Sequence, residues 1–304
     1  MYIVGVDGGG TKTETAFADL NGEVIKTVTG RPSSMRNIGW EQAVINVAET
    51  MAGMKEVCSL FVGLPAFAEE YGEKKEQIEK MLREKLADVL TPEAVVVAGS
   101  DQEVAFRSGS DKKDGVVVIA GTGSVARGWN GDREVKVGGW GWLVDKGGAL
   151  QIGIEAVKRT VEAFDGRRMK SSLTEKVMEH FQAQHVNDIN RIIYQKDRAE
   201  FLAPLAITAN ELVEEDEVAR EIITQAADSL ADSYATALRQ LNFTENFPVV
   251  LAGSMFKSEL FMDTFRRKAE RANSLAEIII PTEKPVYGAV LLAKNNYDKK
   301  NEKR

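Results

Sequence analysis

The sequence predicts a protein of two α/β domains, and three observations support this. The chain has 304 residues, whereas a single hydrophobic core stops growing at roughly 250 to 300 residues. Its composition, 43% hydrophobic and 28% charged, is that of an ordinary globular protein. One succession of elements also occurs twice: strand, glycine-threonine turn, strand, Asn-Gly turn, strand. We therefore expect two domains built on the same plan.

The first domain begins with an apolar stretch, residues 2–6, that runs into Asp7 and three glycines. Such a run predicts a buried strand followed by a tight turn. Residues 13–20 and 23–28 alternate polar and apolar around Asn21-Gly22, which predicts a hairpin. The glycine turn therefore joins two strands. Four further elements are expected in this domain: a helix over 40–51, a strand over 58–62, a charged helix over 71–86 and a strand over 94–98.

A polar, turn-rich stretch over residues 108–115 predicts the domain boundary. After it, an apolar strand over 115–119 leads into the turn 120–124, and Asn130-Gly131 precedes a strand over 134–137. The plan of the first domain is thus repeated. The remaining elements are expected to be helices between 148 and 241, a strand over 248–252, a helix ending at 272, a strand over 277–280 and a helix over 285–297.

The first glycine turn, residues 7–13, nearly matches a P-loop. A threonine separates its last glycine from Lys12, which breaks the GxxxxGK[ST] spacing, and the turn opens a hairpin where a P-loop opens a helix. A glycine turn between strands still brings backbone N–H groups close to phosphate oxygens, because glycine has no Cβ. Asp7 beside it is a candidate Mg²⁺ ligand. The alternative is a hairpin that needs its glycines only for positive φ.

The second glycine turn favours the phosphate interpretation. Residues 121–126 satisfy the pattern GxGxx[GA] of dinucleotide sites, but a turn and a strand follow where that pattern requires a helix. Two matching phosphate loops between strands, one in each domain, indicate instead a nucleotide held between duplicated domains.

These residues carry a resemblance to a known superfamily. Residues 7–13, 120–124 and 249–254 resemble the two phosphate motifs and the adenosine motif of the actin, hexokinase and heat-shock-chaperone ATPases. Together with Gly138-Gly139-Trp140-Gly141 and the segment 285–289, they are similar to the BadF/BadG/BcrA/BcrD ATPase family, which contains N-acetylglucosamine kinases. The resemblance implies two ribonuclease-H-like, actin-like lobes with an interlobe cleft, and a homodimer. The expected lobes are residues 1–112 with the C-terminal helix 286–304 packed on them, and residues 113–285 with a helical insertion.

The resemblance also implies transfer of a phosphoryl group from ATP, with Mg²⁺, to an amino sugar. The expected acceptor is the 6-hydroxyl of N-acetylglucosamine or a related hexosamine. Asp101 resembles the family's catalytic aspartate and would take the hydroxyl proton as general base. By position alone, a helix N-cap, which Ser100 or Asp101 could provide, would be the better interpretation, and the resemblance reverses that preference. The implied nucleotide-binding residues are Gly8, Gly9, Gly10, Thr11, Lys12, Thr13, Gly121, Thr122, Gly123, Ser124, Gly253 and Ser254.

The sugar site implied by the resemblance departs from the family at two positions. Many members have asparagine where Ser34 stands, so either Ser34 replaces it or Asn37 acts from three residues further on. Lys146 stands where family kinases commonly have glutamate. With Arg31 and Arg36 it could suit the lactyl carboxylate of N-acetylmuramic acid, although exposed loop charges are the ordinary alternative. The implied sugar-binding residues are Ser34, Asn37, Asp101, Thr122, Gly139, Trp140 and Asp145.

Composition weighs against several other classes of protein. The net charge of −7 argues against a nucleic-acid partner. The sequence shows neither a membrane-length apolar run nor a signal peptide, so no membrane partner is expected. A single cysteine, Cys58, fits a cytoplasmic chain and does not supply the two thiolates of the family's iron–sulfur activators. His180 and His185 lack cysteine neighbours for zinc.

Two kinds of alternative stay open. The acceptor could be N-acetylmuramic acid or glucosamine in place of N-acetylglucosamine. The less favoured alternative is that the protein is an ATP-hydrolysing regulator or activator and not a kinase.

Overall fold

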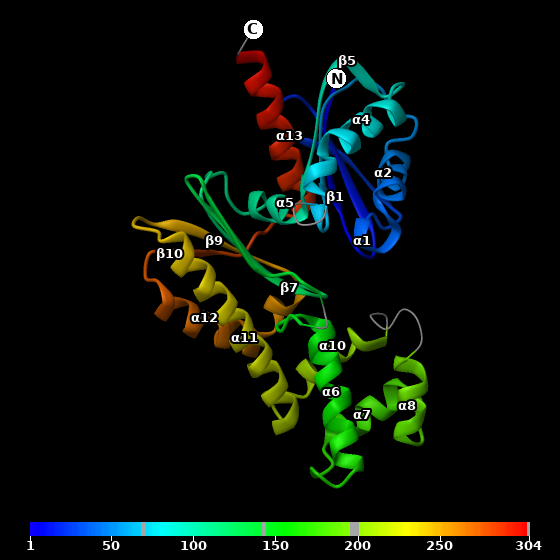
Figure 1. Ribbon diagram of the computed structural model, residues 1–304, viewed down its shortest axis with the longest axis vertical. Helices are drawn as coiled ribbons and strands as arrows, with labels where there is room; N and C mark the ends of the chain where they lie inside the picture. Colours follow the sequence, from blue (N-terminus) through cyan, green and yellow to red (C-terminus); the bar gives the residue numbers. More distant parts are fainter. Residues whose placement is uncertain (68–70, 142–143, 195–200, 303–304) are drawn as a thin grey trace. The chain divides into compact units, whose positions relative to one another are not determined.

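The computed structural model describes residues 1–67, 71–141, 144–194 and 201–302. Residues 195–200 of the predicted helical region and the last two residues of the predicted C-terminal helix lie outside these ranges. The chain forms two compact units (Figure 1). The first unit comprises Met1–Asp111 and Ile280–Arg304, and the second comprises Lys112–Ile279.

The first unit is built on a five-stranded mixed sheet with the order β3-β2-β1-β4-β5. The first three strands are antiparallel, and β4 and β5 run parallel to β1. The strands are β1 (Tyr2–Gly8), β2 (Thr13–Ala18), β3 (Val24–Gly30), β4 (Val57–Leu64) and β5 (Leu90–Ser100). The helices are α1 (Met35–Ile38), α2 (Trp40–Glu49), η1 (Gly72–Lys74), α4 (Lys75–Lys85), α5 (Asp101–Arg107) and α13 (Pro285–Glu302).

Hydrophobic side chains cover both faces of this sheet. Val4 and Val6 of β1 belong to a buried cluster with residues of α2 and α4, whereas Ile3 belongs to a second cluster with residues of α13. This division follows from the two-residue period of a strand, which sends alternate side chains to opposite faces. Figure 1 shows α13 and α5 on one side of the sheet and α2 and α4 on the other. The C-terminal helix is thus part of the core of the first unit.

Helix α13 approaches β1 so closely that Gly5 leaves no room for a side chain. A Cβ at Gly5 would lie 2.2 Å from the backbone nitrogen of Val290 and 2.5 Å from the carbonyl carbon of Ala289. Both neighbours are backbone atoms, so the helix itself would have to move. We expect Gly5→Ala to destabilise the protein by at least the ~1–3 kcal/mol typical of overpacking.

The thermal unfolding midpoint tests this expectation. The control is Gly72→Ala, because among the described residues a Cβ at Gly72 meets only the Phe67 carbonyl oxygen, at 3.9 Å. An unchanged midpoint for Gly5→Ala, measured beside the control, would show that α13 is not docked on β1 in this way.

The second unit repeats the topology of the first. Its five-stranded sheet has the order β10-β9-β6-β7-β8, in which β6 takes the place of β1. β7 is antiparallel to β6 and β8, and β9 is parallel to β6 and β10. The strands are β6 (Gly115–Ala120), β7 (Ser124–Asn130), β8 (Arg133–Gly138), β9 (Phe247–Ala252) and β10 (Ala276–Ile279). Two mixed sheets of one plan confirm the predicted duplicated α/β fold.

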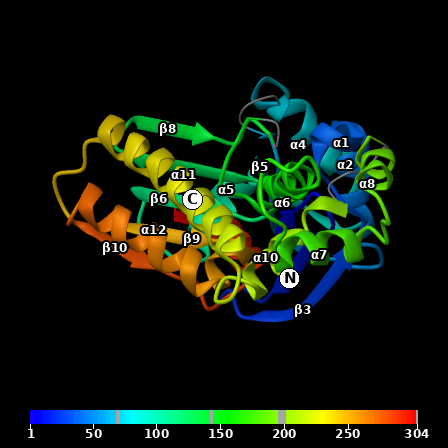
Figure 2. The same ribbon diagram turned by 90° about the horizontal axis from the view of Figure 1, so that it is seen from below.

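Helices α11 and α12 lie along one face of this sheet, as Figure 2 shows. Residues of α6, α11 and α12 join sheet residues in one buried cluster. Between β8 and β9 the described part of the chain is mainly helical. The helices of the second unit are α6 (Ala149–Phe164), α7 (Ser172–His180), α8 (Val186–Ile193), α10 (Leu205–Glu211), α11 (Glu217–Leu241), η2 (Ser254–Lys257) and α12 (Glu259–Ala272).

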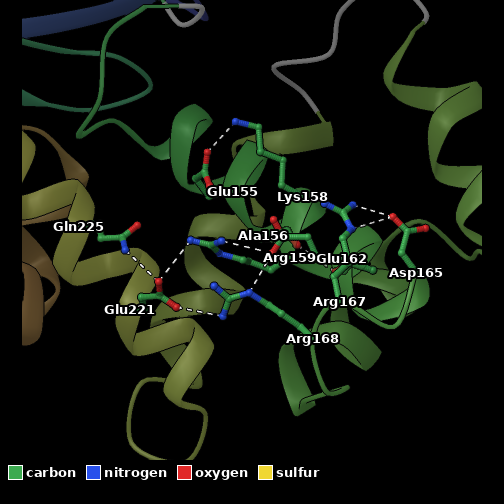
Figure 3. Close-up of polar contacts among 11 residues, drawn as sticks. Glu155, Ala156, Lys158, Arg159, Glu162, Asp165, Arg167, Arg168, Glu221 and Gln225 are labelled. Atoms are coloured by element: carbon green, nitrogen blue, oxygen red, sulfur yellow. Dashed lines mark hydrogen bonds and ion pairs between the residues drawn. The ribbon is translucent and has the colours of Figure 1, made fainter.

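A network of ion pairs joins α6 to α11 (Figure 3). Glu162 accepts hydrogen bonds from Arg159 at 3.3 Å and from Arg168 at 2.8 Å. Glu221 of α11 accepts from the same two arginines at 3.3 and 3.2 Å. Each carboxylate thus bridges both guanidinium groups, and the four charges are balanced. The network fixes the end of α6 and the turn after it against the start of α11.

Candidate functional site

In the first unit, parallel strands bring two predicted site residues to one edge of the sheet. Asp7 of β1 lies opposite Gly63 of β4, and Gly63 lies opposite Gly99 of β5. Asp101 follows two residues after Gly99, at the start of α5. Because parallel strands end at the same edge of a sheet, the carboxylates of Asp7 and Asp101 are neighbours. This edge is where ligands bind in many open α/β sheets.

The electrostatics of Asp7 reflect this neighbourhood. Burial, together with the negative charges of Asp101 and Glu14, raises the pKa of Asp7 to about 7 despite the opposing charge of Lys12. Burial and nearby like charges both disfavour an ionised carboxylate. A cation bound at this edge would relieve that repulsion. A metal ion, alone or bound to a nucleotide, would supply such a cation.

The glycine turn between β1 and β2 is anchored at its base and exposed at its tip. The hydroxyl of Thr13, which is buried, donates to the Arg31 carbonyl at 2.6 Å and lies 2.8 Å from the Ser33 hydroxyl. The backbone N–H of Ser33 donates to the Gly9 carbonyl at 3.1 Å. The exposed residues at the tip are Gly10, Thr11 and Lys12.

The loop that follows β3 therefore packs against this turn. Ser34, the residue after Ser33, is buried, whereas Asn37 is exposed on α1. Ser33 is not predicted by the sequence, because serine is common in loops and its hydroxyl gives no signal in a single sequence.

At the start of α5, the capping and carboxylate functions are divided between two residues. The hydroxyl of Ser100 accepts the backbone N–H of Gln102 at 3.0 Å, so Ser100 is the N-cap. Asp101 is the first residue of the helix and is half-buried. The N-cap predicted at this position is therefore Ser100 and not Asp101, whose carboxylate accepts a hydrogen bond from the Ser100 hydroxyl at 3.5 Å.

In the second unit, the glycine turn between β6 and β7 is held by the start of α6. The backbone N–H groups of Ala149 and Leu150 donate to the carbonyls of Gly121 and Thr122 at 2.8 and 3.1 Å. Thr122 and Gly123 remain exposed at the tip. The carbonyls of this turn are thus engaged with α6.

The end of β9 meets the same turn through Gly253. A Cβ there would lie 2.3 Å from the Ala120 carbonyl oxygen, and φ is +107°, so glycine is required on both grounds. The second unit therefore brings its predicted phosphate turn, 121–124, together with the predicted adenosine residues Gly253 and Ser254.

A glycine-rich segment and Asp145 complete this assembly. The backbone N–H of Gly139 donates to the Ser124 carbonyl at 3.0 Å, and the carboxylate of Asp145 accepts the N–H of Gly141 at 2.6 Å. Trp140 between them is 67% exposed, and the ammonium of Lys136 lies 4.4 Å from its ring centroid. That distance is within the range of a cation–π interaction. An exposed aromatic ring and a carboxylate are thus presented beside the turn.

The only cysteine lies away from these groups. Cys58 is buried in β4, where its thiol donates to the Tyr2 carbonyl at 3.3 Å, and burial raises its pKa. Among the described residues, no three His, Cys, Asp or Glu side chains are grouped to hold a metal ion. No helix in the described part of the chain is long and apolar enough to cross a membrane.

Two units of one topology, each with a glycine turn between its first two strands, define the duplicated fold of the actin and hexokinase type of ATPase. The fold also matches a solved structure of a proposed N-acetylglucosamine kinase from Chromobacterium violaceum, with a TM-score of 0.73 and 20% identity over 96% of this chain and 98% of that one. The chain belongs to the BadF/BadG/BcrA/BcrD ATPase family, whose model matches residues 4–293.

Two curated relatives are similar over nearly their whole length. The N-acetylmuramic acid/N-acetylglucosamine kinase of Clostridium acetobutylicum is 28% identical over 98% of this chain and 99% of its own. The N-acetyl-D-glucosamine kinase of Dictyostelium discoideum is 30% identical over 97% of this chain and 98% of its own. The family resemblance expected from the glycine turns is thereby confirmed.

Proposed function

We propose that this protein is an ATP-dependent kinase that phosphorylates an amino sugar, with the 6-hydroxyl of N-acetylglucosamine as the main acceptor. One observation carries the proposal most strongly: a carboxylate that is not needed for capping, Asp101, lies beside Asp7 at the sheet edge that carries the glycine turn. A general base and a phosphate loop at one edge are what phosphoryl transfer to a hydroxyl requires. The names of the curated relatives support the substrate class.

The proposed roles follow from what each group offers. The turns 8–13 and 121–124 and residues Gly253 and Ser254 bind the nucleotide. Asp101 accepts the proton of the sugar hydroxyl as it attacks. The sugar contacts are assigned to Asp101, Thr122, Gly139, Trp140 and Asp145. Ser34 takes the place of the family asparagine, because it is buried next to Ser33, which contacts the first turn, while Asn37 is exposed.

Mg²⁺ is proposed as the cofactor, and Asp7 as the residue that holds it. Mg²⁺ is commonly bound through one or two carboxylates together with phosphate oxygens and water. A single half-buried carboxylate with neighbouring negative charges fits that pattern. When bound, the ion would neutralise charge on the transferring phosphoryl group.

Of the three cations considered for an anionic acceptor, one is paired with a carboxylate and another lines an acidic cavity. Arg31 forms an ion pair with Glu49 at 2.6 Å. Lys146 lines a cavity of about 320 Å³ whose other charged lining residues are Glu155, Asp228 and Asp232. The charge of Arg31 is therefore offset without a substrate carboxylate. The acidic lining around Lys146 disfavours a further anion there, which supports the neutral N-acetylglucosamine as the main acceptor.

This assignment predicts the effect of Lys146→Met. The ratio of kcat/KM for N-acetylglucosamine to that for N-acetylmuramic acid should change by less than about twofold, since a cation that directly paired with the substrate would be worth about tenfold or more. The measurement compares both sugars with wild-type and variant protein. A selective loss of N-acetylmuramic acid turnover in the variant would assign Lys146 to the lactyl carboxylate.

A screen for sugar-stimulated release of ADP tests the proposed class of enzyme. N-acetylglucosamine, N-acetylmuramic acid and glucosamine would each be supplied with ATP and Mg²⁺, and we expect the largest stimulation with N-acetylglucosamine. If no sugar raises ATP turnover above the rate without sugar, the kinase proposal fails and the regulator alternative gains.

The activator alternative is disfavoured because Cys58 is buried and hydrogen-bonded, which does not suit a cluster-binding thiolate. We further propose that the enzyme is a homodimer, which rests on the family resemblance. Its single cysteine supports the proposal that it acts in the cytoplasm.

A further inference from the structure

Glu14 lies at the base of the first glycine turn and is contacted by two lysines. Its side chain is only 14% exposed, on β2. The ammonium of Lys12 lies 3.0 Å from Glu14 Oε1, and that of Lys284 lies 3.3 Å from the same oxygen. Lys284 is 270 residues away in sequence and directly precedes α13. One largely buried carboxylate is therefore shared between the turn and the start of the C-terminal helix.

The charge of Glu14 is maintained by these two contacts. Burial raises its pKa, but the hydrogen bonds and charges of Lys12 and Lys284 outweigh burial and hold the pKa below its ordinary value. The carboxylate is thus ionised at neutral pH. The three side chains carry two positive charges and one negative charge. Without Lys284, the remaining pair of Lys12 and Glu14 would be neutral.

The extra positive charge supplied by Lys284 matters because Lys12 is one of the exposed residues at the tip of the turn. A lysine fully paired with a neighbouring carboxylate offers little charge to a phosphate, since the carboxylate and the phosphate compete for the same ammonium group. A second lysine on the carboxylate reduces that competition. The position of Lys284 is in turn fixed by the packing of α13 against β1.

We infer that Lys284 is a positioning residue for nucleotide phosphates: by sharing Glu14, it leaves the charge of Lys12 available to them. The inference rests on the proposed function of residues 8–13 as a phosphate loop. It gives the C-terminal helix an electrostatic role in addition to its packing, and it explains how a phosphate-binding turn accommodates a glutamate.

The test is a double-mutant cycle on the affinity for Mg²⁺-ADP, measured by calorimetry at low ionic strength without sugar. Lys284→Met should raise the Kd about three- to fivefold, as expected for the loss of a partly exposed charge that acts through a neighbour. In a Glu14→Gln background, where the Glu14 carboxylate no longer competes for Lys12, the same change should alter the Kd by less than about twofold. High salt should reduce the effect of Lys284→Met, because exposed charges are screened.

Two further variants serve as controls. Lys284→Arg keeps the charge and should bind ADP as the wild type does. Lys294→Met removes another lysine of α13, one that pairs with Asp298 at 2.6 Å, and should also leave the Kd unchanged. Thermal midpoints near that of the wild type establish that the variants are folded. If Lys284→Met does not fold, the pair Lys284→Arg and Lys284→Gln carries the comparison.

Three outcomes would overturn the inference. The first is a wild-type Kd for Lys284→Met. The second is an equal loss in the wild-type and Glu14→Gln backgrounds, which indicates a role independent of Glu14. The third is wild-type protein that binds no ADP. Wild-type protein that binds ADP but phosphorylates no amino sugar contradicts the proposed function instead, and the cycle can still be measured.

Discussion

Asp101→Asn is expected to lower kcat by about 100- to 10,000-fold, because general base catalysis typically accelerates a reaction by that factor. Asparagine has nearly the same shape as aspartate but does not accept the hydroxyl proton. Because Ser100 supplies the N-cap of α5, the fold should tolerate the change. The Kd for Mg²⁺-ADP and the thermal midpoint should stay close to those of the wild type. Steady-state kinetics with a saturating sugar measure kcat, and calorimetry measures the Kd for Mg²⁺-ADP.

Ser100→Ala is the matched comparison at the neighbouring position. It removes the hydroxyl that accepts the Gln102 N–H, so it should cost about 1 kcal/mol of stability. Its kcat should remain within a few-fold of the wild type. If Asp101→Asn instead keeps its turnover and loses stability, Asp101 is a structural residue and the base must be sought elsewhere.

Asp7→Asn is expected to abolish Mg²⁺-dependent turnover and, without ligands, to stabilise the protein above neutral pH. The pKa of Asp7 is about 7 in the folded protein against an ordinary value of 3.8. The folded protein therefore binds this proton more tightly than the unfolded chain does. Its contribution to stability is complete below pH 3.8 and is lost as the pH rises through 7. That loss amounts to at most about 4 kcal/mol.

The comparison requires thermal midpoints of both proteins between pH 5 and 8.5, without nucleotide or metal. At pH 8 the midpoint of Asp7→Asn should exceed that of the wild type by several degrees, and the difference should shrink toward pH 5. With Mg²⁺ and ADP the wild type should recover stability and the variant should not. A variant less stable than the wild type at pH 8 would show that burial and the neighbouring negative charges do not destabilise the ionised form of Asp7.

In the wild type, the concentration of Mg²⁺ needed for activity should rise below pH 7, because protonated Asp7 does not bind the ion.

The sequence predicted the duplicated fold well because its signals are local. Asn21-Gly22 and Asn130-Gly131 mark the hairpins, and Gly22 and Gly131 do have positive φ, at 92° and 61°. Element ends were less accurate. β5 begins at Leu90 where the prediction began at 94, because Thr91-Pro92-Glu93 interrupts the apolar pattern. Proline is tolerated there because β5 is an edge strand, and edge status depends on the whole sheet.

Contacts between residues far apart in the sequence could not be predicted from the sequence. The hydroxyl of Ser33 on Thr13, and Lys284 on Glu14, arise only once the loop after β3 and α13 are packed. The neighbouring carboxylates of Asp7 and Asp101 likewise depend on the register of β1, β4 and β5. A single sequence carries the residue types for these contacts, but the sheet brings them together.

The most direct test of the central claim is to identify the product by phosphorus NMR after incubation with ATP, Mg²⁺ and N-acetylglucosamine. We predict a phosphomonoester on the 6-hydroxyl, formed in a one-to-one ratio with ADP, and at least about 100-fold slower formation of it by Asp101→Asn. ADP and inorganic phosphate without any phosphorylated sugar would contradict the account.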